Sequence, residues 1–169
     1  MNVVFKEQIV KRKPTIKDAL IRACLIVVVV LVFLVTIVQF GAIGVLITAV
    51  VGFGANYVMG FLSVEYEYAI TDKELDIDAI YARSRRKRVF SASLSNVEVM
   101  AHVSDNAHEH TFSRMQKLCD YTSATGNDNV YAFLLSYNGK YTKVLIEPNE
   151  KMLAAIAPAI GRGKLFLKK

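Results

Sequence analysis

Forty consecutive residues near the start of the chain, Ala23 to Leu62, contain no Asp, Glu, Lys or Arg. The tripeptide Gln39-Phe40-Gly41 interrupts this apolar run near its middle. One crossing of a bilayer takes roughly 20 helical residues, at a rise of ~1.5 Å per residue. The pattern therefore predicts a transmembrane hairpin at residues 19–62, with helices at about 20–38 and 42–62 joined by a tight turn.

The second predicted helix carries a small or polar residue at every fourth position, which favours one packing face. Small residues let another helix approach closely, and an asparagine can form a hydrogen bond across the contact. Whether the other helix is the first span or belongs to a second copy stays open, and glycine is also common in membrane helices without such a role. The predicted helix-packing residues are Gly44, Thr48, Gly52, Asn56 and Gly60.

Lys and Arg flank the hairpin on its two outer ends and are absent from its turn. Residues 1–18 form a basic head, and a cluster of cations follows the second span at residues 83–88. Because positive charge favours the cytoplasmic side, we predict a multi-pass protein of the cell membrane with both termini cytoplasmic. The head itself is predicted to lie on the membrane as a short amphipathic segment, interrupted at Pro14.

From Ser63 onward the apolar residues alternate with polar ones, which is typical of half-buried strands. The pattern predicts a small antiparallel β domain over residues 63–161. Its first four strands are expected to form a meander, at about residues 64–70, 75–81, 87–93 and 97–103.

The second half of this domain begins with a polar stretch, residues 104–128, in which helical spacing predicts a helical insertion at about 110–121. Two strands then flank Asn138-Gly139, a strong hairpin signal. A C-terminal helix is expected at 149–160, followed by a basic tail at 162–169. The predicted fold class is thus α+β: a two-helix transmembrane hairpin, a small antiparallel β domain and a closing helix.

The segment from Tyr66 to Val99 combines a tyrosine-rich strand, a Thr-Asp turn, Leu75-Asp76-Ile77, a basic turn and Ser93-Leu94-Ser95-Asn96-Val97-Glu98-Val99. This order resembles the front half of bacterial pleckstrin-homology-like (PH-like) domains. The whole chain resembles uncharacterised two-span membrane proteins of Firmicutes that carry such a domain. The resemblance implies a split barrel plugged by the C-terminal helix, and it implies no catalytic residues. Residues 104–128 depart from the simplest form of the domain.

Five cations lie within six residues of a predicted hairpin turn close to the membrane. Such a cluster can contact anionic lipid headgroups, at about 1 kcal/mol per cation. It can equally serve only to fix topology and to keep the domain soluble. The candidate lipid-binding residues are Arg83, Arg85, Arg86, Lys87 and Arg88.

The net charge of +6 also suits nucleic acid, but the chain lacks the interleaved aromatic residues of single-strand binders, so no nucleic-acid partner is expected. His102, His108, His110 and Cys119 show no familiar metal-ligand spacing, which predicts no metal and no cofactor. Neither a phosphate-binding loop nor a nucleophile motif is present, so we do not expect an enzyme.

These patterns together predict a membrane-anchored, cytoplasm-facing binding or scaffold module with an unknown ligand. Membrane lipid, a protein partner or a second copy of the chain are the expected partners. The alternative function is that of a small accessory subunit of a larger membrane complex, packing through its second helix.

Overall fold

The computed structural model describes residues 5–126, 128–161 and 163–167. The chain forms two compact units. The helical unit comprises Lys13–Val64 together with Tyr81–Arg85, and the β unit comprises Met1–Arg12, Glu65–Ile80 and Arg86–Lys169. The fold class predicted from the sequence, α+β with an N-terminal helix pair, β sheets and a C-terminal helix, is confirmed.

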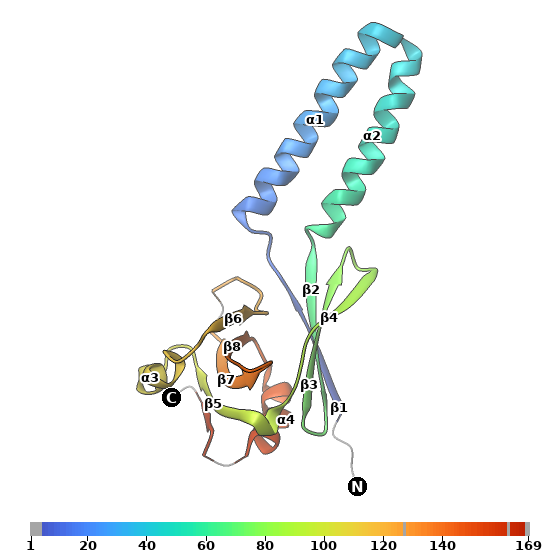
Figure 1. The fold of residues 1–169 in the computed structure, drawn as a ribbon. Coiled ribbons are helices and arrows are strands. Elements are labelled where there is room, and N and C mark those ends of the chain that lie inside the picture. The colour runs from blue at the N-terminus through green and yellow to red at the C-terminus, as the bar shows by residue number, and fades with distance from the viewer. Residues whose placement is uncertain (1–4, 127, 162, 168–169) are drawn as a thin grey trace. The chain divides into compact units, whose positions relative to one another are not determined.

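Two antiparallel helices make up most of the helical unit, α1 (Ile16–Phe40) and α2 (Ala42–Phe61) (Figure 1). The first helix begins earlier than predicted because Thr15 and Asp18 cap it, with the Thr15 N–H donating to Asp18 Oδ2 at 2.8 Å. Gly41 joins the helices with φ of 56°, a backbone conformation that glycine adopts without strain.

Within the described residues the strands form two sheets, one of four and one of five strands. The order in the first is β1-β2-β3-β4 and in the second β6-β8-β7-β5-β9. The first sheet contains β1 (Phe5–Lys11), β2 (Val64–Thr71), β3 (Glu74–Tyr81) and β4 (Arg85–Ser93). The second contains β5 (Val97–His102), β6 (Lys117–Asp120), β7 (Tyr131–Tyr137), β8 (Lys140–Ile146) and β9 (Leu165–Phe166).

The C-terminal helix α4 (Glu150–Ile160) closes the core of the β unit. Its apolar stripe, with Met152 and Ile156, is buried together with the inward side chains of both sheets, among them Tyr68 and Phe133. Asn149 caps this helix, its side-chain oxygen accepting from the Met152 N–H at 2.8 Å.

The structure corrects the prediction for the N-terminal head. Phe5–Lys11 is a strand that pairs antiparallel with β2, from Phe5 opposite Thr71 to Lys11 opposite Glu65. Only Val10 of this strand is buried, so its sequence lacks the clear alternation of a half-buried strand. Pairing with β2 makes this segment a strand, because the edge of β2 would otherwise have no hydrogen-bonding partner strand. Residues 1–4 of the head lie outside the described residues.

The helical insertion predicted at about 110–121 is also corrected. Helix α3 covers only Glu109–Phe112, after the short 3₁₀ turn η2 (Asn106–His108), and Lys117–Asp120 forms strand β6. Phe112 is buried, whereas Met115 and Leu118 are exposed, so the helical spacing does not produce a buried stripe.

The predicted four-strand antiparallel meander is wrong in its last member. A 3₁₀ turn, η1 (Leu94–Asn96), ends the first sheet, and β5 starts the second one. The domain is not purely antiparallel either, because β6 pairs parallel with β8 and β9 pairs parallel with β5. Of the predicted basic tail, residues 162, 168 and 169 lie outside the described residues.

Candidate membrane-facing and binding surfaces

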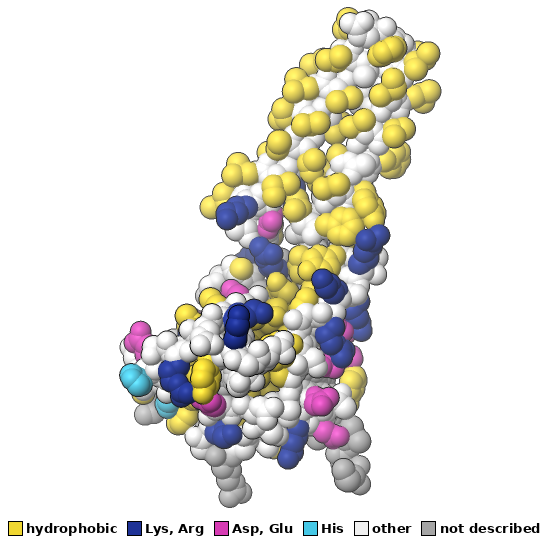
Figure 2. Space-filling view, in the orientation of Figure 1, with side chains coloured by type: hydrophobic (Ala, Val, Ile, Leu, Met, Phe, Trp, Pro, Cys, Tyr) yellow, Lys and Arg dark blue, Asp and Glu magenta, His cyan; other side chains and the backbone are white. Residues whose placement is uncertain are grey.

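The surface of the helix pair is almost entirely apolar (Figure 2). Only Gly44 and Ala55 of the two helices are buried, while large side chains such as Phe53 and Val38 are about four-fifths exposed. Both helices have the length and apolar character needed to cross a bilayer. An uncovered apolar surface of this extent is unfavourable in water and suggests membrane anchoring.

The two helices are in close contact at Gly44. A Cβ atom at this position would lie 2.3 Å from the backbone oxygen of Thr36, so only glycine fits. Beside it, the hydroxyl groups of Thr36 and Thr48 are 3.1 Å apart, and Thr48 also donates to the Gly44 oxygen at 2.9 Å. The polar groups of this contact therefore satisfy one another inside the hairpin.

The other residues of the predicted packing face do not meet α1. A Cβ on Gly52 would have open space around it, and one on Gly60 would lie 3.3 Å from Ala82 in the β3–β4 turn. An α-helix turns ~100° per residue, so each four-residue step rotates the stripe by about 40°. Over the sixteen residues from Gly44 to Gly60 the stripe therefore moves from one side of α2 to nearly the opposite side.

Asn56 lies on the outward part of this stripe, beside an open hollow of about 260 Å³. Ala49, Gly52 and Phe53 line the remainder of the hollow. The amide of Asn56 makes no hydrogen bond with any residue that the structure describes. Such a group is costly in an apolar medium, which makes this face a candidate contact for another helix.

The candidate lipid-binding cations begin in the turn between β3 and β4. Ala82 and Arg83 both have positive φ, of 51° and 56°, which is uncommon for residues other than glycine. Arg85 donates to the Tyr57 hydroxyl at 2.9 Å and lies 5.4 Å from the centre of the Phe61 ring. The turn is thus held against the last turns of α2 within the helical unit.

The next cations along β4 are paired with acids of the first sheet. Arg86 forms an ion pair with Glu67, and Arg88 contacts Asp76 at 2.8 Å and Asp78 at 2.9 Å. The hydrogen bond with Asp78 raises the pKa of Arg88. The sequence suggested a cluster of five cations, but cross-strand carboxylates balance the charge of two of them. Lys87, between these two, is exposed.

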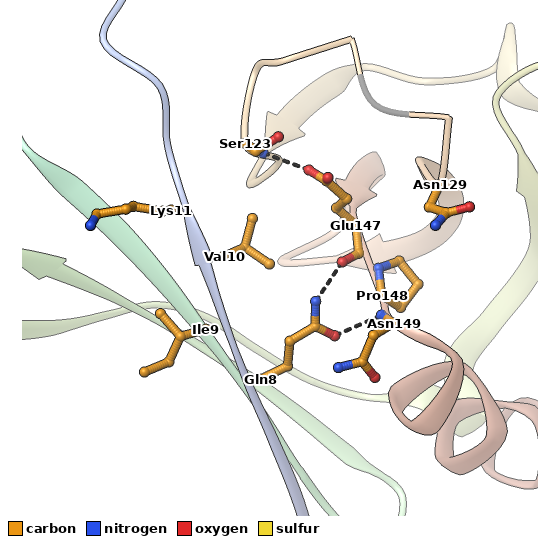
Figure 3. A pocket seen from close by; sticks show the side chains of 9 residues that line it. All are labelled: Gln8, Ile9, Val10, Lys11, Ser123, Asn129, Glu147, Pro148 and Asn149. Carbon is orange, nitrogen blue, oxygen red and sulfur yellow. Dashed lines mark hydrogen bonds between the residues drawn. The ribbon is translucent and has the colours of Figure 1, made fainter.

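A polar pocket of about 280 Å³ lies beside β1 in the β unit (Figure 3). Gln8 donates to the Glu147 backbone oxygen and accepts from the Asn149 N–H, each at 2.8 Å. The carboxylate of Glu147, a nearly buried residue, accepts from the Ser123 N–H at 2.9 Å. No motif in the sequence indicated this pocket, because its residues come together only through the pairing of β1.

A second cleft of the β unit, about 670 Å³, lies between the β5–α3 segment and β9. His108 stacks on Phe166 with ring centres 3.8 Å apart and contacts Asp105 at 3.0 Å. His102 contacts the Ser104 hydroxyl at 2.7 Å. Among the described residues, no group of three or more His, Cys, Asp or Glu side chains is arranged to hold a metal ion.

Residues 2–166 match the model of the family described as "Bacterial PH-like domain (DUF6106)". The chain belongs to this family. The match confirms the PH-like resemblance inferred from residues 66–99, whereas an origin in Firmicutes stays a prediction. The comparisons with curated proteins and with solved structures gave no match.

The family match covers β1 and both long helices as well as the two sheets. A role that uses the helices and the β unit together is consistent with this extent.

Proposed function

We propose that this protein is a membrane-anchored binding module of the bacterial PH-like family. Helices α1 and α2 cross the cell membrane, and the β unit lies on the cytoplasmic side, where it presents a binding surface. A protein partner, membrane lipid or a second copy of the chain is the expected ligand. No reaction, metal or cofactor is part of this proposal.

The apolar exterior of the helix pair is the observation that carries the proposal. A helix of a soluble protein hides its apolar side in a core, but nearly all side chains of α1 and α2 point outward. The orientation follows from charge, because Lys13 precedes α1, Lys17 and Arg22 lie in its first two turns, and Arg83 and Arg85 follow α2. The turn at Gly41 has no charged neighbour between residues 23 and 62.

The edge strand β1 supports a protein partner. Its Phe5 and Ile9 are 55% and 60% exposed, on a strand whose outer side pairs with no described strand. Extended peptides bind at such edges by adding a strand, with pockets for alternate side chains. The pocket at Gln8 and Glu147 lies directly beside this strand.

A photo-crosslinking amino acid at Ile9 tests this binding surface in native membranes. We expect a discrete adduct from Ile9, because a partner that pairs with β1 would bring its backbone within a few ångströms of this side chain. The matched control is the same amino acid at Lys140, an exposed residue of the β7–β8 hairpin. Equal adduct patterns from both positions, or none from Ile9, would contradict a β1 binding surface.

Weak contact with anionic lipid is a further part of the proposal. Arg85 and Lys87 are exposed cations of the predicted cluster, and neither forms an ion pair with the acids of β2 and β3 described above. Each is expected to contribute about 1 kcal/mol at a membrane surface.

Asn56 favours a second candidate function, that of an accessory subunit in a larger membrane complex. Its unpaired amide and the hollow at Gly52 lie on the side of α2 that does not meet α1. Another transmembrane helix would satisfy both. Co-purification of membrane partners measures this association.

A further inference from the structure

Arg22 lies in the second turn of α1, and its guanidinium has no partner among the residues that the structure describes. The side chain is partly buried, and its Nε atom is shielded and makes no hydrogen bond. Arg22 forms no hydrogen bond or ion pair with any residue of the described chain. An arginine held in this way, with a shielded donor and no acceptor, is unfavourable unless another group supplies the acceptor.

The nearest acid along the helix does not fill this role. Asp18 is one turn before Arg22, but its carboxylate accepts from the Thr15 N–H in the helix cap. The helix start is thus already capped, and Asp18 is committed to the cap. Since no described residue supplies the acceptor, a bound ligand is the candidate source.

A hollow of about 450 Å³ borders Arg22 on the same face of α1. Thr15 lies at its N-terminal end, Ala19 and Ala23 line its middle, and Ile26 lies at its deeper end. The hollow is apolar except near Thr15 and Arg22. An occupant that fits it has an anionic group and an apolar chain.

The length of the hairpin gives the depth of Arg22. Phe40, at the end of α1, lies eighteen positions after Arg22, which corresponds to about 27 Å of helix. The hydrocarbon core of a bilayer is ~30 Å thick. With the Gly41 turn at one surface, Arg22 lies near the other boundary, where the phosphates of the inner leaflet are within reach of its side chain.

We propose that Arg22 binds the phosphate of an anionic phospholipid seated in this hollow. The headgroup lies beside Thr15 and Ala19, and an acyl chain runs along Ala23 and Ile26. A guanidinium suits this ligand, because its planar fork donates two parallel hydrogen bonds to a phosphate. Anionic lipid is favoured over phosphatidylcholine, whose own ammonium group competes for the phosphate. This site rests on the proposed function, since it requires the helices to lie in the bilayer.

The test uses the full chain in nanodiscs of phosphatidylcholine with a minor share of phosphatidylglycerol. Native mass spectrometry then measures how far phosphatidylglycerol is enriched among the lipids that stay on the protein. We expect enrichment for the unaltered chain and a fall of about fivefold for Arg22→Gln, the factor that corresponds to one cation at a membrane surface. Arg22→Lys should lie between the two, because it keeps the charge but loses the fork.

Lys17→Gln is the matched control, because it removes the same charge from an exposed position of the same helix. This variant should keep the enrichment, and excess inorganic phosphate should not displace the lipid. An equal loss in Lys17→Gln and Arg22→Gln, an unchanged enrichment in Arg22→Gln, or displacement by free phosphate would each overturn the site. A chain that inserts but shows no enrichment refutes this inference alone, whereas a chain that does not enter nanodiscs refutes the proposed function as well.

Discussion

At the scale of single residues, Tyr68 links both sheets to the β8–α4 connection. Its side chain is fully buried, and its hydroxyl donates to the Tyr121 oxygen at 2.5 Å and accepts from the Glu147 N–H at 3.4 Å. Burial, more than the nearby Glu147 and Asp120 carboxylates, raises the pKa of Tyr68 above its ordinary value of 10.0. Tyr121 behaves alike, since burial also raises its pKa.

Because of these two tyrosines, we expect the protein to lose stability in alkaline solution. Their pKa values are higher in the folded state, so their contribution to stability is complete below about pH 10 and falls as the pH rises above it. Tyr68→Phe should cost about 1–3 kcal/mol at neutral pH, because two buried polar groups lose their partner. Tyr68→Phe should also reduce the loss of stability at alkaline pH, and the loss that remains should come from Tyr121.

Denaturant unfolding of the full chain in detergent, at neutral pH and above pH 10, measures both effects. Tyr141→Phe is the control, because Tyr141 is only partly buried and its hydroxyl forms no hydrogen bond with the described residues. Similar stability and pH dependence in Tyr68→Phe and in the unaltered chain would show that the buried hydroxyl has no such role.

At the scale of elements, α2 has two different faces. Gly44 and Thr48 pack on α1, and Gly52 and Asn56 lie on the outward side. The sequence predicted the five small and polar residues, but it could not assign them to partners, because the four-residue spacing drifts around a straight helix. Thr36 of α1 distinguishes the residues that face α1 from those that face outward, because it contacts Gly44 and Thr48.

Association through the outward face is testable with Asn56→Leu. This change removes the amide and keeps the side-chain size, so the hairpin itself should stay folded while the retention of membrane partners falls several-fold. Co-purification from detergent-solubilised membranes measures the effect. Val50→Leu, on an exposed position of the same helix, is the control. Unchanged retention in Asn56→Leu would remove the accessory-subunit candidate.

The errors of the sequence analysis lie where long-range pairing decides the local structure. Residues 5–11 alternate poorly because one side of the edge strand is open, and only β2 makes them a strand. Lys117–Asp120 is a strand because β8 offers it a parallel partner, although its spacing suggests a helix. By contrast, the hairpin at Asn138-Gly139 and the helix at 150–160 carry their own turn and capping signals, and both were predicted.

The ion pairs of the candidate lipid-binding residues could not be predicted from the sequence either. The sequence places five cations together, yet Asp76, Asp78 and Glu67 lie across the sheet from Arg88 and Arg86. Cross-strand neighbours are set by register, which a single sequence does not give. Nor does the sequence indicate that Arg22 lacks a partner among the described residues, because this depends on the helix cap at Thr15.

At the scale of the whole molecule, the proposed anchoring through α1 and α2 accounts for the composition. The hydrophobic fraction of 53% is high for a soluble protein of 169 residues, and the helix pair holds the excess. The family match over residues 2–166 includes this pair.

Thiol labelling in intact cells tests this arrangement most directly, after Cys24 and Cys119 are replaced by Ser. A membrane-impermeant maleimide should label Gln39→Cys, beside the Gly41 turn, in intact cells. It should label Lys140→Cys, in the β unit, only after the cells are permeabilised. Labelling of Lys140→Cys in intact cells, or recovery of the chain in the supernatant after ultracentrifugation without detergent, would contradict the account.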